Sequence, residues 1–90
     1  MARYLIERTF PDGFAIQPTP EGAQACREIV DNNTYHGVTW VHSYVTADKK
    51  KMLCIYDAPS PGAIRAAAKR NNLPVDSITQ ISVLDPYFCQ

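Results

Sequence analysis

Two matching helix-start signals, Thr19-Pro20 and Ser60-Pro61, constrain the fold of this chain more than any other feature of its sequence. A Ser or Thr N-cap followed by Pro at the first helical position favours a helix at each site. After each signal apolar residues recur at helical spacing, as Ala23, Cys26, Ile29 and Val30 and then as Ile64, Ala67 and Ala68. An Asn-Asn pair closes each pattern. We therefore expect two helices whose apolar stripes face a sheet, with Cys26 as a core thiol.

Runs of strand-forming residues surround these helices, at 3–10, 37–45, 52–56 and 77–84. The resulting order is β-α-β-β-α-β. At 90 residues the chain has room for one small core. With right-handed crossovers, this order predicts a single α+β domain over residues 1–90. We expect a ferredoxin-like sandwich, with a four-stranded antiparallel sheet ordered 4-1-3-2 and both helices on one face.

The two strands around Lys49 carry the residues with the most chemical content. With the turn centred on Asp48, antiparallel pairing sets His42 opposite Cys54 on one side of the sheet. That side would also hold Trp40, Tyr44, Met52 and Tyr56. The opposite side, with Val41, Ser43, Leu53 and Ile55, is small and largely aliphatic, so we expect the helices to cover it. The aromatic side is then left open and lines a cavity between two copies, which predicts a homodimer braced by the tail 87–90.

Side chains directly opposite each other in a sheet are close enough to share one metal ion, so His42 and Cys54 form a candidate ligand pair. On the first strand, Glu7 would face the same cavity and supply a third ligand. An imidazole, a thiolate and a carboxylate together suit nickel, zinc or copper. The alternative is that His42 and Cys54 only satisfy packing and hydrogen bonds at an interface.

Several motifs resemble a family of small bacterial proteins that includes a nickel-binding protein. They are the runs 37–45 (GVTWVHSYV), 54–59 (CIYDAP), 72–75 (NLPV) and 84–86 (LDP). The resemblance extends from Tyr4 to Tyr87 and implies a ferredoxin-like dimeric fold and nickel binding. It implies no ligand set, so Glu7, His42 and Cys54 remain a prediction from strand geometry.

The favoured function is therefore a non-enzymatic metal-binding homodimer for nickel handling or sequestration, with no predicted catalytic residue. The alternative is a dimeric α+β barrel enzyme, or a small-molecule-binding protein, that uses the aromatic cavity. RNA binding ranks last, because nine basic residues balance nine acidic ones and no RNP1-type run is present. The same charge balance argues against membrane-surface binding. Without a signal-peptide pattern or a long apolar stretch, we expect a cytoplasmic protein with free thiols.

Overall fold

The structure, a computed structural model, describes residues 1–16 and 18–89. Its elements, in chain order, are β1 (Ala2–Thr9), α1 (Pro20–Tyr35), β2 (Thr39–Val45), β3 (Lys51–Ala58), α2 (Pro61–Asn71), β4 (Ser77–Ile81) and a 3-10 turn, η1 (Pro86–Cys89). The strands form one antiparallel sheet in the order β2-β3-β1-β4. The predicted strand order and the ferredoxin-like α+β fold are thus confirmed, although β4 ends three residues earlier than expected.

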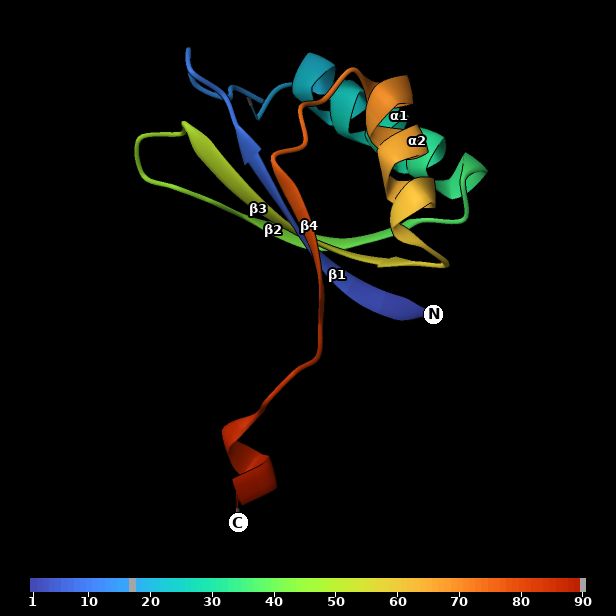
Figure 1. Ribbon diagram of the computed structural model, residues 1–90. Helices are drawn as coiled ribbons and strands as arrows, with labels where there is room; N and C mark the ends of the chain where they lie inside the picture. The colour runs from blue at the N-terminus through green and yellow to red at the C-terminus, as the bar shows by residue number, and fades with distance from the viewer. Residues whose placement is uncertain (17, 90) are drawn as a thin grey trace.

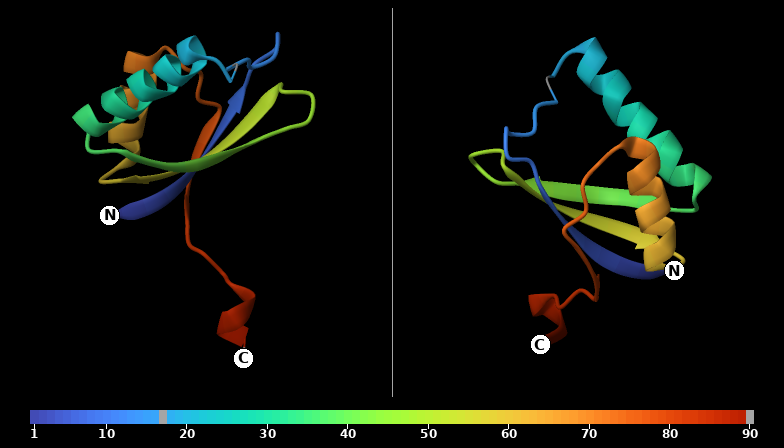
Figure 2. Two further views of the ribbon diagram at one scale, coloured as in Figure 1. Left: turned by 180° about the vertical axis from the view of Figure 1, so that it is seen from behind. Right: turned by 45° about the horizontal axis from the view of Figure 1, so that its top comes forward.

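Both helices lie on the same face of the sheet, and the other face carries no helix (Figures 1 and 2). After β4 the chain leaves the sheet on the side away from the helices and ends in η1 (Figure 1). Tail side chains Val83, Leu84 and Tyr87 are largely exposed. Residue 90 of the predicted tail brace lies outside the described residues. In the part of the chain described here, no helix is long and apolar enough to cross a membrane.

The helix-start signals work as the sequence predicts. The Thr19 hydroxyl accepts a hydrogen bond from the Gly22 N–H at 3.2 Å, and the Ser60 hydroxyl accepts one from the Ala63 N–H at 3.2 Å. Each cap satisfies an N–H that has no partner inside the helix. At the end of α2, Asn72 takes the left-handed conformation with φ 57°, which asparagine tolerates better than most residues.

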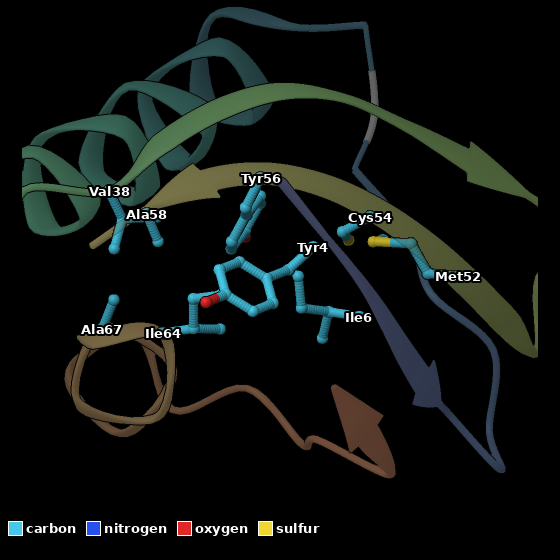
Figure 3. Packing of buried hydrophobic residues seen from close by; sticks show 9 residues of the cluster. All are labelled: Tyr4, Ile6, Val38, Met52, Cys54, Tyr56, Ala58, Ile64 and Ala67. Carbon is cyan, nitrogen blue, oxygen red and sulfur yellow. The ribbon is translucent and has the colours of Figure 1, made fainter. Parts of the chain in front are cut away.

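The core lies between the sheet and α2 (Figure 3). Tyr4 and Ile6 of β1 point into it, and Ile64 and Ala67 of α2 meet them, all nearly or fully buried. Alternation along β1 places Arg8 on this same inner face, and it is completely buried. A charged side chain in this position is the main departure from an ordinary apolar core.

Helix α1 is less deeply packed than its sequence predicts. Of its apolar stripe, Cys26 and Ile29 are only half-buried, and Val30 is exposed. The prediction of Cys26 as a core thiol is therefore wrong. The Asn pairs explain how the helix is held: the Asn32 amide donates to Asn71 at 2.8 Å, and the Asn71 amide donates to Asn33 at 3.0 Å. These bonds tie the C-terminal part of α1 to the end of α2.

Candidate functional site

The hairpin between β2 and β3 contains a β-bulge that the sequence did not reveal. Trp40 pairs with Tyr56, as predicted, but the register then shifts, so that His42 pairs with Ile55 and Ser43 pairs with Cys54. Val41 is the extra residue at the shift. Because successive side chains alternate between faces, the one added residue places His42 and Tyr44 on the opposite face from Trp40.

The turn explains why the register shifts. Thr46 and Lys51 close it, with the Thr46 N–H donating to the Lys51 carbonyl at 3.0 Å. The Asp48 carboxylate accepts bonds from the Lys50 N–H at 3.0 Å and the Thr46 hydroxyl at 2.7 Å, and Lys49 takes a positive φ of 60°. These contacts centre the turn between Asp48 and Lys49, half a residue beyond the predicted centre. The extra residue in the bulge compensates for this shift, so that Trp40 still has its predicted partner.

The predicted pairing of His42 with Cys54 is consequently wrong. Cys54 is 1 % exposed and lies on the helix side of the sheet, next to Ile6 of β1 (Figure 3). His42 is exposed and shares the helix-free face with its partner Ile55. The two side chains point to opposite sides of the sheet, so they cannot share one ion within a chain.

The prediction that aromatic side chains line an open cavity is also wrong. Met52 and Tyr56 are buried beneath the helices, and Trp40 packs against the same core, where its indole N–H donates to the Ser43 hydroxyl at 2.8 Å. Of the four predicted lining residues only Tyr44 remains on the open face, where it is 61 % exposed. The helices cover the side with the aromatic rings because Tyr4 and Ile6 pair directly with Tyr56 and Cys54.

The helix-free face, called the open face below, therefore has a different composition from the one predicted. Its centre is aliphatic and half-buried, with Leu5, Leu53, Ile55 and Ile81. His42 and Tyr44 stand beside it on β2, with their rings edge to face and the centroids 5.1 Å apart. An apolar sheet face with an imidazole at its margin can pack against another surface and bring that imidazole into a water-poor space.

Glu7 lies on the open face, as predicted, where its carboxylate accepts a hydrogen bond from the Ser77 hydroxyl at 2.7 Å. It does not meet His42. Strand β3 separates them, and Glu7 pairs with Leu53, whereas the partner of His42 is Ile55. Among the described residues, no three His, Cys, Asp or Glu side chains are grouped closely enough to hold a metal ion. The predicted three-ligand site is therefore absent from the described part of one chain.

An ion pair closes the end of the open face near the N-terminus. The Arg3 Nε donates to Asp57 Oδ1 at 2.8 Å, and its Nη2 donates to Asp57 Oδ2 at 3.0 Å. These hydrogen bonds hold the pKa of Asp57 below its ordinary value and raise that of Arg3. Because the Asp57 carboxylate is engaged by the Arg3 cation through both oxygens, Asp57 is a poor candidate for a metal ligand on this face.

Sequence reasoning missed Arg8, whose side chain lies on the helix-covered face of the sheet. The Arg8 Nη1 donates to the Pro74 carbonyl at 2.8 Å, and Nη2 donates to the Tyr56 hydroxyl at 3.1 Å. The signal was present: Glu7 was expected on the face away from the helices, and strict alternation then places its neighbour Arg8 on the helix side.

These features define a small α+β protein of the ferredoxin-like class, with an apolar open face that carries an imidazole and a carboxylate. Residues 4–81 match the family described as "Nickel responsive protein SCO4226-like", and the chain belongs to that family. In a search of solved structures, the chain is similar to the crystal structure of SCO4226 from Streptomyces coelicolor A3(2). The TM-score is 0.72 and the identity 14%, over 93% of this chain and 100% of that one. At this identity the likeness concerns the fold. No curated protein gives a significant match.

Proposed function

We propose that this protein is a cytoplasmic homodimer that binds nickel for handling or sequestration, with the metal site completed between two open faces. The observation that carries the proposal is the exposed His42 imidazole beside a half-buried aliphatic sheet face. Imidazole is a ligand that nickel favours, together with zinc and copper. The family name supplies the reason for preferring nickel. The free thiols Cys26 and Cys54 suit the reducing cytoplasm.

A second copy is needed because one chain does not fit a metal on its own. The described residues offer no three-donor group, and His42 and Glu7 lie two strands apart. Packing two open faces about a two-fold axis doubles the donors between them to two imidazoles and two carboxylates. In this proposal His42 and Glu7 are the candidate ligands, and Cys54 is not, because it is buried on the other side of the sheet.

The apolar surfaces also favour a dimer. Leu53 and Ile55 form the middle of the open face, and Tyr44 is more than half exposed beside them. The tail after β4 runs off on that same side and exposes Leu84 and Tyr87 at 82 % and 78 % (Figure 2). Covering these side chains with a second copy would remove apolar surface from water, the usual driving force for association.

Metal binding is tested by calorimetric titration of nickel into apoprotein prepared without a histidine tag. His42→Ala should weaken binding at least about tenfold, since removal of one ligand or its partner commonly costs that much. Glu7→Gln should weaken it by a similar factor, whereas Cys54→Ala, a core change, should leave the affinity unchanged. Zinc and copper titrations show whether nickel is preferred. Normal affinity in His42→Ala would refute this site.

Dimerisation is tested separately by sedimentation equilibrium. The wild-type protein should sediment as a dimer. Leu53→Asp, which places a charge in the middle of the open face, should dissociate it. Arg65→Asp is the matched control, because Arg65 lies exposed on α2 and the substitution introduces the same side chain. A monomeric wild type, or a Leu53→Asp dimer as stable as the control, would contradict the interface. Because the metal site spans two copies, nickel should also tighten the wild-type dimer.

A further inference from the structure

Most of the large apolar side chains that the described chain exposes lie in two segments. One is the tail, residues 82–89, which follows β4, and the other is β2, an edge strand of the sheet. Six of the nine exposed side chains of this kind belong to them: Val83, Leu84 and Tyr87 in the tail, and Val41, Tyr44 and Val45 on β2. Apolar residues scattered singly over a surface are ordinary, whereas groups of them mark surfaces that a partner covers. The tail and β2 are therefore the two sides of a candidate contact.

The tail does not cover its own sheet. It runs away from the rest of the molecule on the side opposite the helices (Figures 1 and 2). Leu84 and Tyr87 are 82 % and 78 % exposed, and Tyr44 on the open face is 61 % exposed. The tail nevertheless has a defined shape, because the Asp85 carboxylate accepts a hydrogen bond from the Tyr87 N–H at 2.8 Å at the start of η1. Asp85 also precedes Pro86, which favours an extended backbone there. The tail is thus a short projecting arm.

The surface area of the chain indicates the size of the contact that one copy leaves open. The chain exposes 6081 Å². A folded monomeric protein of 10.1 kDa exposes about 5,300 Å². The excess, roughly 800 Å², equals the area that each partner buries in an interface of standard size. One further copy of the chain is therefore enough to cover the excess.

The symmetry of a homodimer brings the tail and β2 together. Strands β4 and β2 are the opposite edges of the sheet. A two-fold axis that runs between the facing sheets, parallel to the strands, reverses the strand order of the partner across the contact. The end of β4, from which the tail departs, then lies over the partner's β2. The tail also reaches far enough, because residues 82–85 span about 13 Å when extended and packed sheets lie about 10 Å apart.

We propose that in the homodimer the tail of each copy crosses to the partner and packs against the partner's β2, where it covers the exposed apolar side chains. The exchange is reciprocal, so each tail stabilises the other subunit. Removal of both groups of apolar side chains from water supplies the driving force. This inference rests on the homodimer proposed above and adds the segment that holds its two copies together.

Photochemical cross-linking tests the exchange, because it distinguishes a contact with the partner from a contact within one chain. The photoreactive residue p-benzoylphenylalanine replaces Tyr87 in the full chain. Irradiation should give a covalent dimer on a denaturing gel, and peptide mapping should place the new bond in residues 39–45 of the partner. The matched control carries the same residue in place of Tyr35, which is 72 % exposed on α1 on the helix side of the sheet, and should remain monomeric on the gel.

A second measurement uses sedimentation equilibrium. Tyr87→Ser should raise the dissociation constant of the dimer at least tenfold, whereas Tyr35→Ser should leave it unchanged. Both variants should fold, because both side chains are largely exposed. A wild-type dimer whose cross-links stay within one chain, or map outside the partner's β2, would overturn the exchange and leave the proposed homodimer intact. A monomeric wild type would overturn both. A covalent dimer that binds no nickel would support the exchange and contradict only the metal site.

Discussion

Substitution of Cys54 by alanine tests the face assignment on which the site depends. Cys54 is 1 % exposed, so Cys54→Ala removes a buried sulfur and leaves a small void beside Ile6. Loss of one methyl-sized group from a core costs about 0.5–1.5 kcal/mol. For a domain of this size, the total stability is on the order of 5–13 kcal/mol, so the variant should remain folded. Its melting temperature should fall by roughly 4–8 °C for each kcal/mol lost.

Urea unfolding followed by Trp40 fluorescence and circular dichroism measures the change, at one fixed protein concentration in case subunits dissociate. With a slope of about 1–3 kcal/mol per molar urea, a loss of about 1 kcal/mol lowers the midpoint by roughly 0.3–1 M. Cys26→Ala provides the matched control. Cys26 is half-buried on α1, and alanine is the better helix former, so its midpoint should stay the same or rise.

The same variant separates a core role from a ligand role. Cys54→Ala should lose stability and keep its nickel affinity, whereas His42→Ala should keep its stability, because His42 is exposed. The reverse pattern would refute the reasoning. A Cys54→Ala protein as stable as the wild type but unable to bind nickel would mean that the thiol faces the metal and that the hairpin has the unbulged register.

Three further results are expected. Thr19→Ala and Ser60→Ala should each lower the free energy of unfolding by about 1 kcal/mol in urea titrations, through loss of an N-cap bond, and no change would mean that solvent replaces the cap. Asn72→Ala should cost roughly 1–2 kcal/mol in the same assay, because alanine resists a φ of 57°. The pKa of Asp57 is lowered from its ordinary 3.8 by the bonds from Arg3, so this pairing stabilises the fold above about pH 4 and is lost as the pH falls through the lowered pKa. Thermal melts should show a shallower acid dependence in Asp57→Asn than in the wild type, and identical profiles would contradict this.

The fold was predictable because its signals are local and agree with one another. Thr19 and Ser60 mark helix starts by their own hydrogen bonds, and the runs of strand-forming residues are recognised without knowledge of any partner strand. Right-handed connection then leaves few ways to join the elements. Each of these steps depends on neighbouring residues in the chain.

The site was less predictable because it depends on the register of the hairpin. When the register slips by one residue, each side chain that follows moves to the other face of the sheet. The contacts of Asp48 with Thr46 and Lys50 shift the centre of the turn by half a residue, and Val41 absorbs the difference as a bulge. No composition rule marks Val41 as a bulge. The inner position of Cys54 could have been found by pairing β3 with β1, since Ile6 and Cys54 share a face.

The bulge at Val41 divides β2 into two parts with different freedom to change. Before it, the strand is anchored to the helix side by Trp40, while the part beyond it takes its orientation from the length of the turn. Insertion or deletion of one residue in this hairpin can therefore exchange which side chains of the outer segment meet solvent and leave the packing around Trp40 untouched. Homologous sequences can in this way carry different chemistry on one scaffold through a single length change.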